Sequence, residues 1–233
     1  MIPHIIAIGG YKNSGKNEAA SMLEYLLNSP DFMHTYKCYT LFHKWFVNKK
    51  YKITSFAYPL KRTLAALLNV DIKRFEDRKF KEYYYVYFPD LRITDIPDNR
   101  KILSDGKFTK MINNRDLSFL KTHYITIRQL LQVFGTEIMR NLFGDKLWIL
   151  STLNEKTNLI VSDLRFKVEY ESVKENFGQC ILIDREGCNP GNHASEKEIE
   201  DLYKNDKFDW IIRNDGTLED LFNNLKAWYW FNN

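Results

Sequence analysis

The sequence predicts an α/β protein with a five-stranded, mainly parallel sheet that is flanked by helices and carries an insertion. Short apolar runs alternate with segments of helical periodicity, which is the pattern of parallel strands joined by right-handed crossovers. The first apolar run leads into a loop with two glycines and a lysine, and then into a helix. The 233 residues are enough for one sizeable α/β domain with an insertion.

The first strand and its loop carry the clearest motif. Residues 5–8 form an apolar run, which is followed by Gly10-Tyr11-Lys12-Asn13-Ser14-Gly15-Lys16-Asn17-Glu18 and a helix. A strand, a glycine loop with a lysine, and a helix are the context that a phosphate-binding P-loop requires. The backbone N–H groups would point inward and the helix N-terminus would favour an anion, while Lys16 would reach the β- and γ-phosphates of a nucleotide.

One position departs from the standard motif. The residue after the lysine is usually Ser or Thr, whose hydroxyl meets Mg²⁺, and here it is Asn17. An amide oxygen can contact the ion or one of its waters, so we expect Asn17 to take this role. The alternative is a glycine-rich turn that binds nothing, but the strand, the spacing and the lysine all favour the phosphate-binding interpretation.

Composition excludes several classes of protein. The net charge of +4, from 34 basic and 30 acidic residues, suits small anionic substrates and does not by itself indicate nucleic-acid binding. The three scattered cysteines have no CxxC pair, which argues against a disulfide framework and a zinc site. The chain shows no signal-peptide pattern and no run near the ~20 apolar residues of a membrane span. We therefore expect a cytoplasmic protein with no membrane contact.

The other strands follow in order along the chain. Apolar runs at 51–56, 158–162, 180–183 and 209–213 complete the predicted five strands. Residues 71–125 are charged, aromatic and interrupted by prolines, and we expect them to form an insertion with a hairpin around 101–110. The aromatic run at 83–88 is interpreted as a packed surface or a strand, with a base-stacking platform as the less favoured alternative.

A helix with a polar face begins at Thr126, where Thr126 and Gln129 form a capping box. Gly135 costs about 1 kcal/mol against Ala in the middle of this helix, so a packed neighbour or a ligand should need the space. Polar side chains recur at every fourth position and are expected to stack along one side: Arg128, Gln132, Thr136 and Arg140. This row suits a phosphate and a base edge, and the alternative is an ordinary solvated face.

Polar residues also follow two of the later strands. Asp163 ends the strand at 158–162, where open α/β sheets place their sites, and it could hold Mg²⁺ or its waters. The alternative for Asp163 is a plain turn or capping role. Arg165 and Glu169 are four residues apart on a helix and are expected to meet. Residues 185–195 form a candidate lid loop with Arg185 at its base, in which His193 is interpreted as a structural hydrogen-bonding residue.

Several ordered motifs together resemble the deoxynucleoside monophosphate kinases of large DNA phages and related viruses. The motifs are the P-loop, Phe56-Ala57-Tyr58-Pro59-Leu60-Lys61, the block from Arg128 to Arg140 with 145–148, Asp163-Leu164-Arg165-Phe166 with Glu169, 193–196 and 214–218. They cover most of the chain outside 28–50 and 71–125. The chain departs from the family at Asn17 and Glu18, where Asp and Thr are common, and at Tyr58, where Asp is common.

The resemblance implies a P-loop fold of the nucleoside-monophosphate-kinase type and transfer of the ATP γ-phosphoryl group to a deoxynucleotide with Mg²⁺. The expected ATP-binding residues are Gly10, Lys12, Asn13, Ser14, Gly15, Lys16, Asn17 and Glu18. Catalytic roles are expected for Lys16, Asp163, Arg165, Arg185 and Glu169, with Asp163 and Asn17 orienting hydrated Mg²⁺. The expected substrate-binding residues are Lys61, Arg128, Gln132, Arg140 and Trp148.

Other functions stay open at the level of the sequence. The acceptor could be another small compound, or the chain could be a nucleotide-binding protein that has lost catalysis, which Asn17 and Glu18 favour slightly. A nucleic-acid-binding module is the weakest alternative, because no stripe of basic residues with interleaved aromatics is persuasive. We expect the binding partners to be small-molecule nucleotides, and a homodimer is one assembly to test. If the protein is viral, we expect it in the cytoplasm of an infected host cell.

Overall fold

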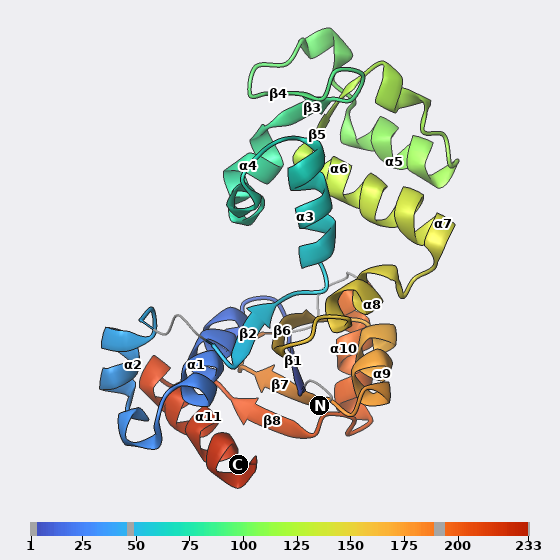
Figure 1. The fold of residues 1–233 in the computed structure, drawn as a ribbon. Helices are drawn as coiled ribbons and strands as arrows, with labels where there is room; N and C mark the ends of the chain where they lie inside the picture. The colour runs from blue at the N-terminus through green and yellow to red at the C-terminus, as the bar shows by residue number, and fades with distance from the viewer. Residues whose placement is uncertain (1–3, 46–48, 189–193, 233) are drawn as a thin grey trace. The chain divides into compact units, whose positions relative to one another are not determined.

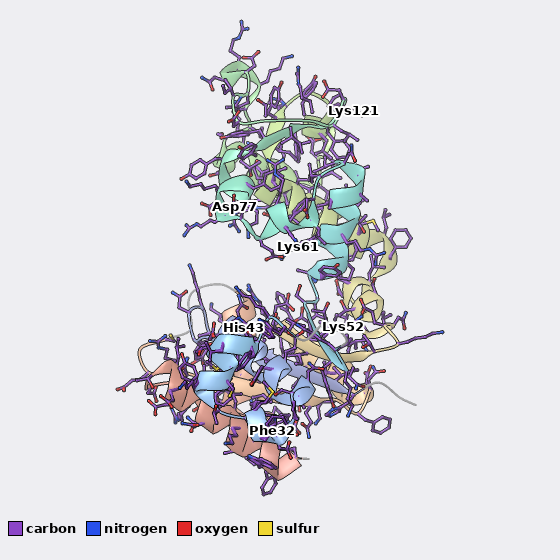
Figure 2. All side chains as sticks on the ribbon, turned by 60° about the vertical axis from the view of Figure 1, so that its left-hand side comes forward. Phe32, His43, Lys52, Lys61, Asp77 and Lys121 are labelled. Carbon is purple, nitrogen blue, oxygen red and sulfur yellow. The ribbon has the colours of Figure 1, made fainter. Side chains whose placement is uncertain are left out.

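The computed structural model describes residues 4–45, 49–188 and 194–232, and these fall into two compact units (Figure 1). The first unit consists of Met1–Phe56 and Ile149–Asn233, and the second unit is Ala57–Trp148. Figure 2 labels Phe32, His43 and Lys52 in the first unit and Lys61, Asp77 and Lys121 in the second. The second unit contains the predicted insertion at 71–125 and extends beyond both of its ends. That the whole chain forms a single domain stays a prediction.

The first unit is built on the predicted five-stranded sheet, and every neighbouring pair of strands is parallel. The strand order is β2-β6-β1-β7-β8, so β1 lies at the centre. The α/β fold class is therefore confirmed. The strands are β1 (Ile5–Gly9), β2 (Tyr51–Thr54), β6 (Asn158–Leu164), β7 (Gln179–Asp184) and β8 (Trp210–Arg213).

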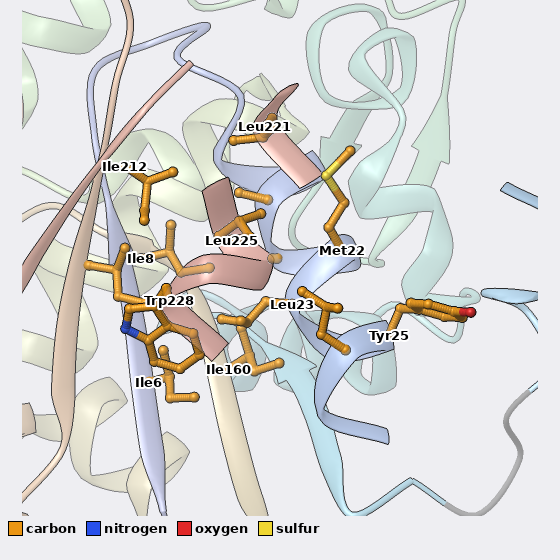
Figure 3. Close-up of a cluster of buried hydrophobic side chains, with 14 of the residues drawn as sticks. Ile6, Ile8, Met22, Leu23, Tyr25, Ile160, Ile212, Leu221, Leu225 and Trp228 are labelled. Carbon is orange, nitrogen blue, oxygen red and sulfur yellow. The ribbon is translucent and has the colours of Figure 1, made fainter. Parts of the chain in front are cut away.

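Helices cover both faces of this sheet, which explains why its strands are continuous apolar runs. Successive side chains of β1 point to opposite faces: Ile6 and Ile8 join one buried cluster, and Ile5 and Ala7 join another. The first cluster includes residues of α1 (Lys16–Asn28) and α11 (Leu218–Asn232) (Figure 3), and it also includes Tyr39 of α2 (Tyr36–Phe42). The second cluster includes residues of α8 (Leu147–Leu153), α9 (Lys167–Glu175) and α10 (Ala194–Lys204).

The second unit combines a small sheet with short helices around its own core. Its antiparallel sheet has the order β4-β3-β5, from β3 (Tyr85–Tyr87), β4 (Arg92–Thr94) and β5 (Tyr124–Thr126). Its helices are α3 (Tyr58–Leu67), α4 (Arg78–Tyr83), α5 (Asp105–Asn113), α6 (Ile127–Gln132), a π-helix (Val133–Arg140) and α7 (Asn141–Phe143). Short 3₁₀ helices lie at Asp31–Met33, Ile72–Glu76, Asn99–Lys101 and Ser118–Lys121, the first of them in the other unit.

Two sequence expectations for this unit have different outcomes. The aromatic run at 83–88 does contain a strand, β3, whose central Val86 is fully buried. The hairpin around 101–110 is wrong, because α5 occupies that stretch, with Phe108 and Ile112 buried one turn apart. The antiparallel hairpin of this unit is instead β3–β4, which pairs Tyr87 with Arg92. Among the described residues, no helix is long and apolar enough to cross a bilayer.

Candidate functional site

The loop that joins β1 to α1 (residues 10–16, here the Lys16 loop) has a backbone that only certain residues can adopt. Gly10 and Gly15 have φ angles of 146° and 96°, and Asn13, a residue that tolerates the left-handed region, has 65°. A Cβ atom on Gly10 would lie 2.6 Å from the Ile183 carbonyl oxygen. A Cβ atom on Gly15 would overlap the side-chain amide of Asn214. Both glycines of the motif are therefore required by close packing as well as by φ.

The side chain of Lys16 folds over the start of its own loop. Its Nζ donates hydrogen bonds to the carbonyl oxygens of Gly10 and Tyr11 at 2.7 and 2.5 Å. The hydroxyl of Ser14 is buried and has no hydrogen-bond partner in the described part of the chain. Gly15, as N-cap residue of α1, supplies no side-chain cap, so the first N–H groups of α1 are not satisfied by their N-cap side chain. The loop thus presents an ammonium, a buried hydroxyl and a helix N-terminus.

Asn214 holds this loop and is a residue to which the sequence interpretation gave no site role. It follows β8, is buried, and donates from Nδ2 to the Ser14 carbonyl oxygen at 2.8 Å. Its backbone N–H donates to the Asp184 carbonyl oxygen at 2.8 Å. The only sequence signal was the turn motif at 214–218, which belongs to the resemblance described above.

The other predicted residues of the loop lie toward solvent or toward α2. Lys12, Asn13 and Asn17 are exposed. The Glu18 carboxylate accepts a hydrogen bond from the Tyr39 hydroxyl of α2 at 2.7 Å. Burial raises the pKa of Tyr39, so this hydroxyl stays protonated and remains a donor at neutral pH. Glu18 is therefore bonded to α2 within the first unit.

Two carboxylates end the strands that flank β1. Asp163 lies near the end of β6, as the sequence predicts, and its Oδ1 accepts from the Phe56 N–H at 2.7 Å. Asp184 ends β7, is buried, and forms an ion pair with Arg213 at 2.5 Å. Sequence reasoning missed Asp184, although it follows an apolar run just as Asp163 does. Both carboxylates stand at the edge of the sheet where open α/β proteins place their sites.

Asp163 and Asn17 each carry an oxygen ligand of the kind that a hydrated Mg²⁺ takes. Mg²⁺ usually keeps several waters and binds through one or two carboxylates together with substrate phosphates. Asp163 supplies a carboxylate and Asn17 an exposed amide oxygen. In the described part of the chain no group of three or more His, Cys, Asp or Glu side chains could form a protein-only metal site. One carboxylate and one amide oxygen suit an ion whose other ligands are waters and nucleotide phosphates.

Glu169 organises the segment that follows β6. It is buried, and its Oε2 accepts from the backbone N–H groups of Arg165 and Phe166 at 2.8 and 3.0 Å. Arg165 precedes α9 and meets Glu169 through its backbone N–H, which these contacts hold in place; the expected pairing of the two side chains on one helix stays a prediction. Arg165 and Arg185 are both exposed. Of the predicted lid at 185–195, residues 189–193 lie outside the described residues, His193 among them. Residues 185–188 form a turn in which the Cys188 N–H donates to the Arg185 carbonyl, and α10 begins at Ala194, so the lid itself stays a prediction.

The predicted polar row in the second unit begins as expected and then changes geometry. The capping box of Thr126 and Gln129 is confirmed, and Arg128, Gln132 and Thr136 are exposed. The prediction of one regular α-helix is wrong from Val133 onward, where hydrogen bonds of the i→i+5 type make a π-helix. Arg140, the last member of the row, is half-buried, and its Nε has no hydrogen-bond partner among the described residues. π-Helical segments occur frequently at functional sites.

Gly135 lies inside the π-helix because a neighbour needs the space. A Cβ atom there would lie 2.6 Å from Cδ2 of Leu60 on α3, so a packed neighbour explains this glycine. The indole N–H of Trp148 donates to the Gly135 carbonyl oxygen at 2.9 Å. Trp148 is only 5% exposed, so these contacts give it a structural role, and a direct contact with substrate stays a prediction.

The fold defines an open α/β protein whose polar groups gather at the carboxyl edge of a parallel sheet, around a lysine-bearing loop. The chain belongs to the deoxynucleotide monophosphate kinase family, because the sequence model of that family matches residues 90–225, more than half of the chain. The match begins in the second unit and continues through β6, β7 and β8 into α11. The Lys16 loop precedes the matched residues, so the family match does not cover it.

A relative from Acanthamoeba polyphaga mimivirus, named "Putative deoxynucleotide monophosphate kinase", is 29% identical over 117 residues. The alignment covers 43% of this chain and 59% of the length of that protein. Among solved structures, dephospho-CoA kinase from Campylobacter jejuni aligns over 97% of this chain and 95% of its own, with a TM-score of 0.37 and 14% identity. At that TM-score the likeness carries no weight for fold or function, and the fold class follows from the sheet itself.

Proposed function

We propose that this protein is a kinase that transfers the γ-phosphoryl group of ATP to a deoxynucleoside monophosphate, giving a deoxynucleoside diphosphate and ADP. The observation that carries the proposal is the family match over residues 90–225. The Lys16 loop supports it, because the loop combines an ammonium with uncapped helix N–H groups. Phosphoryl transfer asks the protein mainly to position the reactants and to compensate spreading negative charge.

The first unit would bind ATP. Lys16 now donates to two carbonyl oxygens of its own loop, and the same ammonium would donate to the β- and γ-phosphates when ATP binds. Asp163, helped by Asn17, would hold hydrated Mg²⁺, which supplies charge neutralisation on the phosphate oxygens. Arg165 and Arg185 would compensate the charge of the transferred group, and Glu169 would keep the Arg165 backbone in place.

The second unit would bind the acceptor. Arg128 and Lys61 are cations whose charge-assisted hydrogen bonds suit a phosphate. Arg140 would add a guanidinium whose Nε is not yet paired within the described residues. Gln132 is the second member of the polar row. Its side chain is exposed and would form hydrogen bonds with the base or the sugar of the acceptor. Trp148 would act through the backbone of Gly135 rather than by stacking on the base.

Substitution of Lys16 tests this assignment. ADP release from Mg-ATP would be measured with dAMP, dGMP, dCMP, dTMP and 5-hydroxymethyl-dCMP offered separately. We expect Lys16→Ala to lower turnover by two orders of magnitude or more, because a preorganised charge contact to a developing anion is worth about 3 kcal/mol or more.

Lys52→Ala, at an exposed position of β2 in the same unit, is the matched control and should keep wild-type turnover. Near-normal turnover in Lys16→Ala would contradict the assignment of the Lys16 loop to the ATP site. ADP release that responds to none of the five monophosphates would point to a different acceptor.

A nucleotide-binding protein without catalysis is the second candidate, and two observations favour it. Asn17 stands where the motif has a hydroxyl, and Glu18 is engaged by Tyr39. ATP binding seen by calorimetry, with no acceptor-dependent ADP release, would support this candidate over the kinase.

A further inference from the structure

Three helices of the second unit bring three cations together. The 3₁₀ helix Ile72–Glu76 packs against both α3 and α4, and α6 packs against α4 and α3. Lys61 lies on α3, Lys81 on α4 and Arg128 on α6. Figure 2 marks Lys61 on α3 and Asp77 at the start of α4. The sequence pattern identified Lys61 and Arg128 and passed over Lys81, which lies in the least regular part of the chain.

Two of the three cations have carboxylate partners. Lys61 Nζ lies 2.8 Å from Glu76 Oε1, and Arg128 Nη2 lies 3.1 Å from Glu82 Oε1. Glu82 is also bonded by Arg78, so one carboxylate serves two guanidinium groups. The Glu76 side chain is 69% exposed, which makes its ion pair weak and easily exchanged.

Lys81 is the cation that lacks a counterion. It is half-buried, and the ion pairs of the nearby carboxylates, Glu76 and Glu82, are made with other cations of the described chain. Burial is the largest cause that lowers its pKa, and the charges of Lys61 and Arg128 lower it further. Glu76 and Glu82 act in the opposite direction without restoring the ordinary value. The two carboxylates of the cluster, Glu76 and Glu82, therefore do not balance its positive charge, and neither is paired with Lys81.

We propose that Lys81 binds the phosphate monoester of the acceptor nucleotide, together with Lys61 and Arg128. A phosphate monoester carries a charge of about −1.5 to −2 at pH 7 and presents three acceptor oxygens, which three donors from three helices can satisfy. The exposed pair of Lys61 with Glu76 would open to release one donor to the phosphate. This inference rests on the proposed function for the identity of the acceptor, while the phosphate-binding cluster itself rests on the contacts of the second unit.

Kinetics of matched lysine variants in the full chain test the role of Lys81. Lys81→Met keeps most of the aliphatic side chain and removes the charge. We expect it to raise the KM for the accepted deoxynucleoside monophosphate at least tenfold, with the KM for ATP within twofold of wild type. Lys81→Arg should recover a large part of the loss, because it restores a permanent charge.

Lys79→Met is the control, because Lys79 is an exposed lysine on the same helix that takes no part in the cluster. It should leave both KM values unchanged. An unchanged monophosphate KM in Lys81→Met, or an equal rise in Lys79→Met, would overturn the proposal.

A binding experiment on the wild-type chain separates this inference from the kinase proposal. The ε-carbon signals of ¹³C-labelled lysines would be followed during titration with inorganic phosphate and then with dAMP, and the Lys81 signal would be identified by its loss in Lys81→Arg. Both ligands should shift the Lys81 signal and raise its pKa toward the ordinary lysine value, while the Lys79 signal stays still.

The outcomes are distinguishable. If no monophosphate is phosphorylated but phosphate shifts Lys81, the kinase proposal fails and the phosphate site stands. If monophosphates are phosphorylated but neither phosphate nor dAMP moves the Lys81 signal, the cluster proposal fails and the kinase stands. A single-stranded oligonucleotide that shifts Lys81 at lower concentration than dAMP would make the cluster a nucleic-acid contact and overturn the proposal.

Discussion

Gly15 shows how a single residue can be required for two separate reasons. Its φ of 96° disfavours any L side chain, and a Cβ atom would overlap the Asn214 amide that bonds the Ser14 carbonyl. A substitution here would disturb both the Lys16 loop and the contact that holds it. Gly106 is the opposite case, because it lies in α5 with nothing within 4 Å of a Cβ atom.

We therefore expect Gly15→Ala to lower the free energy of unfolding by about 1–3 kcal/mol and to weaken ATP binding, since strain at a special backbone angle is of that order. Gly106→Ala, the same chemical change, should leave ATP binding unaltered and stabilise the chain slightly, because Ala is the better helix former. Urea unfolding and calorimetric titration with ATP would measure both. Equal stability and equal affinity in the two variants would refute the strain argument.

Some residues of the candidate site could be predicted from the sequence and others could not. Gly10, Gly15 and Lys16 were predictable because their motif prescribes a loop with glycines at fixed positions and a lysine at its end. Lys81 and Asp184 were not, since their roles depend on which elements pack beside them. Whether the predicted catalytic and substrate-binding side chains act as assigned stays a prediction.

The π-helix from Val133 to Arg140 contacts two neighbouring side chains through Gly135. Leu60 of α3 occupies the space beside Gly135, and Trp148 satisfies the Gly135 carbonyl oxygen. An exposed glycine in the middle of a helix would normally gain about 1 kcal/mol on replacement by Ala. Here the gain is opposed by overlap with a buried leucine, which costs about 1–3 kcal/mol in a packed core.

Gly135→Ala should accordingly destabilise the protein despite its better helix propensity. In the Leu60→Ala background the same change should cost less or become favourable, which gives a coupling free energy in a double-mutant cycle. Denaturant unfolding of the four proteins measures it. Strict additivity would show that Leu60 is not what requires the glycine.

The C-terminal helix α11 packs on a histidine that should respond to pH. The ring of His34 is buried and lies 4.7 Å from the Tyr229 ring and 6.1 Å from the Trp230 ring. Burial lowers the pKa of His34 below the ordinary 6.5. Burial also lowers the pKa of His4, and the charge of Lys50 lowers it further.

A lowered histidine pKa means that the unfolded chain binds more protons than the folded chain at mildly acidic pH. Stability should therefore be constant above about pH 6.5, the unfolded-state pKa, and fall as the pH drops below it toward the folded-state values. His34→Gln should reduce the steepness of this fall while leaving part of it, which His4 contributes. Unfolding curves between pH 5 and 8 measure the effect, and an unaltered pH dependence in His34→Gln would contradict it.

At the scale of the whole molecule, the sequence predicted one unit well and the other poorly. All five strands of the parallel sheet were expected, because strands buried on both faces appear as continuous apolar runs such as 180–183. The second unit consists of three-residue strands and short helices. These elements are too short for the spacing of their apolar residues to predict them from the sequence. Its α5 was taken for a hairpin, and the change from α- to π-helix at Val133 was not predicted, although Gly135 indicated that a neighbour needs space beside this helix.

Direct transfer of label tests whether the γ-phosphoryl group of ATP moves to a deoxynucleoside monophosphate. The full chain would be incubated with Mg²⁺, γ-³²P-ATP and each monophosphate in turn, and the products would be separated by chromatography. We expect label to appear in a deoxynucleoside diphosphate, and we expect Lys16→Ala to abolish this transfer while Lys52→Ala does not. Label that stays in ATP, or that appears only as inorganic phosphate, in the presence of intact ATP binding would contradict it.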